Sequence, residues 1–303
     1  MASITLTCTI QKINAMKLYY NDSLITSPPY AVFAAKTKNA RITAYQSGKV
    51  VFQGNGSDIE AKKWGEEKQE NATHSSYDFS SLNIIGSDEV GNGSYFGPLV
   101  VVATYVSKEQ LPFLKQLHVR DSKTMSDQEM KKIYHAIQGK IKYKVMMVKP
   151  ATYNRIQPQY NAVHMKAVLH NQALALLEQE IKQQHLPLDG IIVDAFTSKK
   201  NYLSYTQKEK NKTTAPLYFK TKGEGYHLAV ALASIIARVL FLKELQAEEE
   251  SLQMKLPIGA NATVDQVASN IIQQKGKEAL TSVAKLHFAN TKKAEALAYK
   301  KRN

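Results

Sequence analysis

The chain has 303 residues, and its 40 lysine and arginine residues outnumber its 26 aspartate and glutamate residues, which gives a formal net charge of +14 and a pI of about 9.5. This length is ample for two domains. So basic a chain favours a polyanionic partner, usually a nucleic acid, although charge alone does not separate RNA, DNA and an anionic membrane surface. The single cysteine, Cys8, excludes an intrachain disulfide and any multi-cysteine zinc site.

The N-terminus and the apolar runs predict neither export nor membrane insertion. Residues 1–7 lack a basic start followed by an apolar block. The most apolar helix-like run, 228–242, is interrupted by Arg238 and is shorter than the roughly 20 residues that a membrane span needs. The sequence contains no P-loop string, so we expect no nucleotide cofactor. These features predict a cytoplasmic protein without a membrane partner.

Residues 1–65 predict a small α+β domain built on an antiparallel sheet. Short β-rich runs separated by turn residues are typical of a meander, and Thr9 can cap a helix. The expected elements are a strand (3–8), a helix (9–20), three strands (30–33, 41–45 and 49–53) and a closing helix (57–64). From residue 66 to residue 81 the composition is polar and lacks apolar periodicity, which predicts a linker.

Residues 82–303 predict a larger α/β domain. Strands come first and helices later, with one crossover between them, and this order favours a mixed sheet flanked by helices. The expected strands are 82–87, 98–106, 141–148, 190–194 and 217–220, and the expected helices are a pair across 108–138, a long one at 161–183, and one at 224–247.

Two adjacent carboxylates, Asp88 and Glu89, follow the apolar run 82–86. Such a pair at the end of a buried strand is costly to desolvate without a compensating charge, and its oxygen atoms suit Mg²⁺ or Mn²⁺. Gly91 and Gly93 come directly afterwards, and glycine allows both tight turns and the close approach of another chain. Together these features suggest phosphodiester chemistry on a nucleic acid.

Two further carboxylates occupy comparable positions. Asp194 ends the apolar run 191–193, and Glu224 precedes an alanine-rich helix. Each has an ordinary alternative, because an Asp after a strand often caps a turn and a Glu before a helix favours the helix dipole. Taken with Asp88 and Glu89, however, four carboxylates could hold two divalent ions, one activating water and one stabilising the leaving oxygen.

The residues that carry these features resemble the type 2 ribonuclease H superfamily. The matching segments are the string 88–98, the tripeptide 121–123 followed by a helix with Ser126 as its candidate cap, the strand end at Asp194, and the Ala-Ser-Ile-Ile-Ala-Arg helix at 233–238. Glu224 in the fourth acidic position and the extra N-terminal domain are more similar to the ribonuclease HIII family than to the ribonuclease HII family, whose fourth acidic residue is Asp. The resemblance runs from residue 82 to residue 291.

The resemblance implies an RNase H-like fold, a monomer, and endonucleolytic cleavage of the RNA strand of RNA/DNA hybrids that leaves 5′-phosphate and 3′-hydroxyl ends. It implies two divalent ions, Mg²⁺ or Mn²⁺, held by Asp88, Glu89, Asp194 and Glu224, with Asp88 bridging both. By the same resemblance, Lys123 would contact a phosphate, and the backbone of Gly91, Asn92 and Gly93 would lie against ribose 2′-hydroxyls, the groups that distinguish RNA from DNA.

The glycine string departs from the ribonuclease HII pattern at one position. This chain has Gly91-Asn92-Gly93 where ribonuclease HII has Gly-Arg-Gly, and in that relative the triplet helps recognise a single ribonucleotide joined to DNA. We therefore expect runs of ribonucleotides to be preferred over single embedded ones.

The N-terminal domain resembles half of a TATA-box-binding protein, a curved sheet that could lie on a duplex. Its candidate contacts to phosphates or sugars are Lys36, Lys38, Arg41, Tyr45 and Lys49. Each has an ordinary alternative as a solvated lysine or a packed strand tyrosine. Two other functions stay open at this point: a non-catalytic protein that binds nucleic acid through this sheet, and a nuclease of the same broad fold that acts on DNA.

Overall fold

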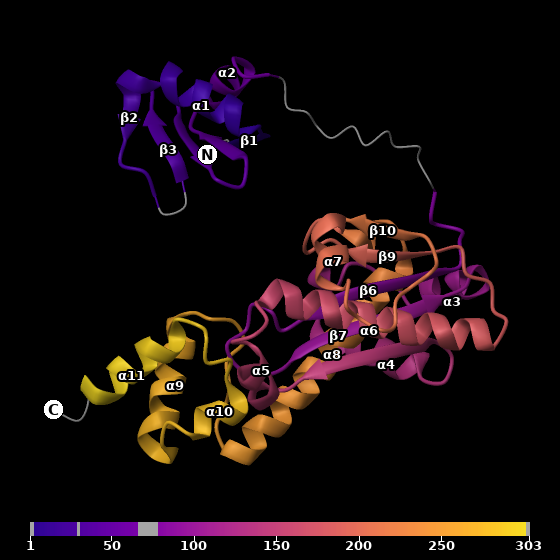
Figure 1. Cartoon of the computed structure of the whole chain (residues 1–303). Helices are drawn as coiled ribbons and strands as arrows, with labels where there is room; N and C mark the ends of the chain where they lie inside the picture. Colours follow the sequence, from indigo (N-terminus) through magenta and orange to yellow (C-terminus); the bar gives the residue numbers. More distant parts are fainter. Residues whose placement is uncertain (1–2, 29–30, 66–77, 301–303) are drawn as a thin grey trace. The chain divides into compact units, whose positions relative to one another are not determined.

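The computed structural model describes residues 3–28, 31–65 and 78–300, and the chain divides after Tyr77 into two compact units (Figure 1). Residue 30 of a predicted strand and residues 66–77 of the predicted linker lie outside the described residues. Within those ranges no helix is long and apolar enough to cross a membrane. The first unit carries an antiparallel sheet and the second a mixed sheet flanked by helices, which confirms the predicted fold class.

The first unit is built on a five-stranded antiparallel sheet in the order β1-β5-β4-β3-β2. Its elements are β1 (Ser3–Thr7), α1 (Ile10–Tyr19), the short 3-10 helix η1 (Asn21–Ser23), β2 (Leu24–Ile25), β3 (Ala31–Lys36), β4 (Arg41–Tyr45), β5 (Lys49–Gln53) and α2 (Ser57–Lys62). The sequence prediction missed η1 and β2, because two or three residues are too few to show periodicity. It gave the other elements their correct type.

Helices α1 and α2 cover one face of this sheet. Ile13 and Met16 of α1 pack with Phe33, Ile42 and Phe52 of the strands in a single buried cluster. The predicted cap is confirmed, since the hydroxyl of Thr9 accepts a hydrogen bond from the backbone N–H of Lys12 at 3.3 Å. Because side chains alternate along a strand, the residues between these core positions point to the opposite face.

The second unit contains a five-stranded sheet in the order β10-β9-β6-β7-β8. Its strands are β6 (Ile84–Val90), β7 (Leu99–Val106), β8 (Lys142–Val148), β9 (Gly190–Asp194) and β10 (Leu217–Lys220). β6 pairs antiparallel with β7 and parallel with β9, so the carboxyl ends of β6 and β9 lie at the same edge. Ligands of open α/β sheets gather at such edges.

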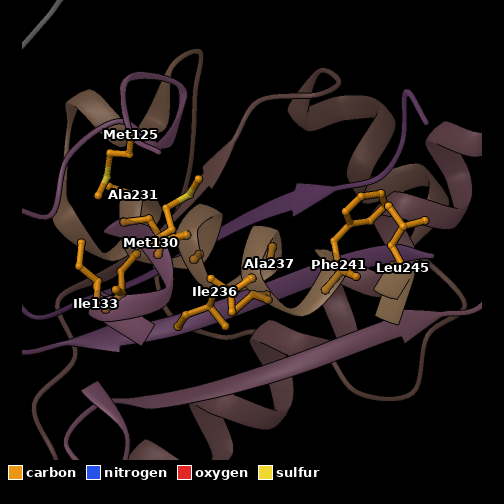
Figure 2. Close-up of a cluster of buried hydrophobic side chains, with 14 of the residues drawn as sticks. Met125, Met130, Ile133, Ala231, Ile236, Ala237, Phe241 and Leu245 are labelled. Carbon is orange, nitrogen blue, oxygen red and sulfur yellow. The ribbon is translucent and has the colours of Figure 1, made fainter. Parts of the chain in front are cut away.

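Helices cover both faces of the sheet (Figure 1). Helix α8 (Leu228–Leu252) packs on β6 and β7, with α4 (Asp127–Ile137) against it, whereas α6 (Ala162–Gln183) packs on the other face. Gly86 lets α8 approach, because a Cβ there would lie 2.4 Å from the backbone nitrogen of Val230. In Figure 2, Met130 and Ile133 of α4 and Ile236 of α8 belong to the resulting buried cluster.

The remaining elements connect these layers and end the chain. They are the 3-10 turns η2 (Lys108–Gln110), η3 (Ser122–Thr124) and η4 (Gly223–Gly225), and the helices α3 (Leu111–Gln116), α5 (Pro150–Ile156), α7 (Lys199–Tyr205), α9 (Ala262–Lys275), α10 (Ala279–Val283) and α11 (Asn290–Lys300). The predicted cap of α4 is confirmed, since Ser126 and Glu129 form a capping box. The sequence prediction did not include α5, α7 or the three helices after α8.

Candidate active site

Strand β6 continues through Asp88 and Glu89 rather than ending before them, as the sequence prediction had it. Pairing with β7 extends to Val90, with Asp88 opposite Val102 and Glu89 opposite Val101. Along β6, Ile84 belongs to the core under α8 and Ile85 to the core under α6. Alternation therefore turns Asp88 toward α8 and Glu89 toward α6.

Asp194 lies beside Asp88 on the neighbouring strand. In the parallel β6–β9 pair Ser87 is level with Val193, and Ile192 belongs to the core under α8, so Asp194 points to the same face as Asp88. Burial, followed by the charges of Glu89 and Asp194, raises the pKa of Asp88 to about 7, although a hydrogen bond with Ser234 acts in the opposite direction. Asp88 and Asp194 thus present negative charge to each other at this edge of the sheet.

Glu224 is joined to Asp194 through the 3-10 turn η4. The backbone N–H of Gly223 donates a hydrogen bond of 2.8 Å to Asp194 Oδ1. Oε1 of Glu224 lies 3.7 Å from Nζ of Lys123, whose side chain is 76% exposed. The sequence prediction started the following helix at residue 224, but that was wrong: α8 begins at Leu228, and His227 caps it by accepting from the N–H of Ala229.

Glu89 has a different environment, because two side chains of α6 hold its carboxylate. Lys166 Nζ lies 2.7 Å from Oε1, and His170 Nε2 lies 2.9 Å from Oε2. Burial acts to raise the pKa of Glu89, but the hydrogen bond and charge of His170 and the charge of Lys166 outweigh it and hold that pKa below its usual value. The sequence prediction missed both residues, although a Lys and a His at i, i+4 within a long apolar helix were a signal.

The carboxylates border a cleft of about 520 Å³. It is lined by Asp88, Glu89, Val90, Gly91, Asn92, Gly93, Ser122, Lys123, Met125, Asp127, Met130, Asp194, Ser234 and Arg238. Glu224 adjoins this cleft through its contact with Lys123. Several lining residues were not predicted as functional, among them Ser234, which contacts the Ser122 hydroxyl at 2.8 Å, and Arg238, which donates from Nε to Asp127 at 2.9 Å.

The glycine string forms one wall of the cleft, and the C-terminal segment holds it in place. Gly91 has a φ of +99°, and a Cβ there would lie 2.0 Å from the carbonyl oxygen of Pro98, so only glycine fits. Asn92 and Gly93 are exposed. Further along, the N–H of Gly97 donates to the Val283 carbonyl at 3.0 Å, which anchors the string to α10.

The oxygen atoms of the four carboxylates are the ligands that divalent ions such as Mg²⁺ prefer, although the side chains do not form a complete metal site. Among the described residues, no three Asp, Glu, His or Cys side chains are arranged to hold a metal ion. Each of three carboxylates has a protein partner where it stands: Glu89 contacts α6, Glu224 contacts Lys123, and Asp194 accepts from Gly223. Burial and the charges of Glu89 and Asp194 raise the pKa of Asp88, and a cation bound beside its carboxylate would act in the opposite direction.

The N-terminal candidates belong to the other compact unit. Lys36, Lys38, Arg41 and Lys49 are exposed and Tyr45 is half-buried. Lys36 pairs with Arg41 across the β3–β4 hairpin, and the core positions flanking Arg41, Tyr45 and Lys49 face α1 and α2. Alternation therefore places these side chains on the sheet face that the helices do not cover, while Lys38 lies in the hairpin turn.

Comparisons with known proteins cover both units. A family model described as Ribonuclease HII matches residues 85–291, and one described as a domain of unknown function, DUF3378, matches residues 3–77. The chain is 48% identical to the Ribonuclease HIII of Enterococcus faecalis over 287 residues, which cover 92% of this chain and 93% of that protein. It is 43% identical to the Ribonuclease HIII of Streptococcus pneumoniae over 297 residues, which cover 97% and 99%.

A solved structure shows the same arrangement. The crystal structure of Bst-RNase HIII in complex with Mn²⁺ matches with a TM-score of 0.72 and 36% sequence identity, over 99% of this chain and 100% of that chain. The mixed sheet and the match over 85–291 make this protein a ribonuclease H hydrolase. The identity extends through the N-terminal unit as well, and the chain belongs to the ribonuclease HIII family. This confirms the resemblance found in the sequence.

Proposed function

We propose that this protein cleaves the RNA strand of RNA/DNA hybrids by metal-dependent hydrolysis that leaves 5′-phosphate and 3′-hydroxyl ends. The observation that carries the proposal is the pair Asp88 and Asp194, which lie side by side on parallel strands in a cleft bordered by Lys123 and Arg238. The carboxylates suit divalent ions, and the basic residues at the rim suit the phosphodiester on which those ions would act. The Mn²⁺ complex of the related Bst-RNase HIII supports the use of divalent ions.

The four carboxylates Asp88, Glu89, Asp194 and Glu224 would hold two divalent ions, Mg²⁺ or Mn²⁺. When bound, such ions activate water and stabilise the leaving oxygen. Lys123, with its side chain 76% exposed, is free to contact a phosphate. Asn92 and Gly93 are exposed and so accessible to ribose 2′-hydroxyls. Because Asn92 stands where ribonuclease HII has an arginine, runs of ribonucleotides would be preferred over single ones.

The N-terminal unit, residues 1–65 in our domain division, would bind the hybrid through the sheet face that carries Lys36, Arg41, Tyr45 and Lys49, with Lys38 at its margin. Exposed cations on one face of a sheet contact phosphates without reading sequence. Residues 66–81 would link this unit to the catalytic domain, 82–303.

Cleavage of a panel of labelled duplexes tests the activity. We expect the full chain with Mg²⁺ or Mn²⁺ to cut RNA/DNA hybrids and DNA duplexes with a run of ribonucleotides, and EDTA to abolish cutting. Ligation and primer extension of the products report the 5′-phosphate and 3′-hydroxyl ends. Efficient incision at a single ribonucleotide would contradict the substrate preference. Equal cutting of DNA/DNA would favour a DNA nuclease, and binding without cutting would favour a non-catalytic protein.

Substitutions in the full chain test the role of the N-terminal sheet. Replacing Lys36, Arg41 and Lys49 by Ala together should raise KM roughly tenfold with kcat nearly unchanged, and should reduce the salt dependence of binding, because each lost phosphate contact lowers that slope. The matched control replaces the exposed Lys12, Lys17 and Lys62 of α1 and α2 on the opposite face. Equal effects of the two triple variants would show that only net charge matters.

A further inference from the structure

The α6 side of β6 holds Glu89 at two points. Lys166 and His170 stand one helical turn apart on α6, so both face the same strand. Lys166 Nζ contacts Oε1 at 2.7 Å, and His170 Nε2 contacts Oε2 at 2.9 Å. The side chains are almost closed to solvent: Lys166 is 7% exposed, His170 0% and Glu89 12%. The carboxylate plane of Glu89 is therefore fixed by the protein.

The His170 ring is itself held in place. Its Nδ1 lies 2.9 Å from the hydroxyl of the buried Ser87, the residue before Asp88. The ring stacks on Phe196 with centroids 4.8 Å apart and an interplanar angle of 25°, and Lys166 Nζ lies 4.4 Å from the centroid of the same Phe196 ring. Because a carboxylate can only accept, the Nε2–H of the ring donates to Glu89, while Nδ1 is held by the Ser87 hydroxyl.

We propose that His170 is a positioning residue for Glu89, with Lys166 as the second anchor, and that together they orient this carboxylate toward a divalent ion at the strand end. The inference rests on the proposed function. Each carboxylate oxygen has two lone-pair sites, so one bond per oxygen to α6 leaves one site per oxygen open. Hydrogen-bond partners that orient metal-binding carboxylates in this way typically contribute 10- to 100-fold in metal affinity.

A purely structural role makes a different prediction. If Lys166 and His170 only neutralise Glu89 to stabilise the fold, their loss changes the melting temperature and leaves the affinity for metal unchanged. If they orient Glu89, their loss weakens metal binding, and it does so only while Glu89 can act as a ligand. Metal binding measured without nucleic acid therefore distinguishes the two roles.

The test is calorimetric titration of the metal-free full chain with Mn²⁺, alongside thermal unfolding in EDTA. His170→Phe keeps a ring against Phe196 and removes both nitrogen atoms, and we expect its Mn²⁺ affinity to fall roughly 10- to 100-fold. His170→Gln, which keeps a side-chain donor, should recover part of the loss. The matched control is His164→Phe on the same helix, whose ring stacks on Tyr205 and which should bind Mn²⁺ like the wild type.

A double-mutant cycle with Glu89→Gln completes the test. Glu89→Gln should itself weaken Mn²⁺ binding, and His170→Phe in that background should add no further loss, because coupled residues are not additive. Two outcomes would overturn the positioning role and leave the proposed carboxylate site intact. One is wild-type affinity in His170→Phe while Glu89→Gln is weakened, and the other is an equal further loss in the double variant. Wild-type affinity in Glu89→Gln overturns the proposed carboxylate site and this inference with it.

Ser87→Ala provides the same test should His170→Phe fail to fold. It removes the Nδ1 partner and frees the ring to change tautomer, so we expect a several-fold loss of Mn²⁺ affinity, whereas wild-type affinity would overturn the proposal.

Discussion

Asp88 and Glu89 are neighbours in sequence, yet β6 turns them toward opposite sides of the sheet with opposite electrostatic settings. On the α8 side, burial and the negative charges of Glu89 and Asp194 raise the pKa of Asp88 to about 7. On the α6 side, Glu89 meets Lys166 and His170, and its pKa stays below the usual value. The charges that act on the pKa of Asp88 are both negative, whereas those that act on the pKa of Glu89 come from a lysine and a histidine. A bound cation should therefore stabilise the charged form of Asp88 more than that of Glu89.

The largest expected effect is on cleavage by Asp88→Asn. Because Asp88 would help to hold the divalent ions, the amide should reduce kcat by roughly 10³-fold or more, which corresponds to about 4 kcal/mol of transition-state stabilisation, while hybrid binding persists. Single-turnover cleavage and a binding titration on the same hybrid measure the two quantities. Retained cleavage would show that Asp88 is not a catalytic residue. The two sides of β6 would then not differ in function as proposed.

The second prediction concerns the stability of metal-free Asp88→Asn. A carboxyl whose pKa is raised from 3.8 to about 7 by folding binds its proton more tightly in the folded state, so wild-type stability falls as the pH rises through that window. The amide has no such loss. We expect the variant to be more stable than the wild type by roughly 1–4 kcal/mol at pH 8 in EDTA, because each pKa unit corresponds to about 1.4 kcal/mol. Urea unfolding at pH 8 and at acidic pH measures the gap, which should close as the pH falls.

Glu89→Gln should have the opposite sign in the same experiment. A folded-state pKa below the usual 4.5 means that the charged form contributes stability above pH 4.5 and that this stability is lost as the pH falls through the folded pKa. The amide leaves Lys166 buried without its counter-ion, so we expect a loss of about 1–3 kcal/mol at pH 8. If both amide variants shift stability in the same direction, the contrast between the two settings is wrong.

The sequence predicted Asp88 and Asp194 at one edge of the sheet because both follow apolar runs, and runs of this kind form buried strands whose ends meet. It did not predict that Asp88 and Glu89 diverge. That requires knowing that β6 continues to Val90, which depends on pairing with Val101 and Val102 of β7. Local alternation does not show how far the pairing of two strands extends.

Lys166 and His170 illustrate the same limit. Their spacing is visible in the sequence, but the strand that α6 covers is not, so the partner of these buried side chains could not be named. Glu224 was placed wrongly in a helix, because the left-handed Lys222, with a φ of 57°, starts a 3-10 turn that periodicity does not reveal. Local patterns indicate elements, whereas contacts between elements decide the orientation of side chains.

The smallest expected effect contrasts the cations of the two sides. Lys123 lies 3.7 Å from Glu224 on the α8 side with its side chain 76% exposed, whereas Lys166 lies 2.7 Å from Glu89 on the α6 side and is 7% exposed. Exposed ion pairs contribute little to stability, so Lys123→Met should change the free energy of unfolding by less than about 1 kcal/mol.

The same variant should weaken hybrid binding several-fold, and its effect should shrink at high salt, because an exposed lysine can neutralise a phosphate. Lys166→Met is the matched comparison: it removes the same charge from a buried position and should cost more stability than Lys123→Met in metal-free urea unfolding. Equal losses of stability would show that exposure does not separate the two cations. Unchanged hybrid binding by Lys123→Met at low salt would show that Lys123 does not contact a phosphate. Losing a cation that contacts the duplex must weaken the complex under those conditions.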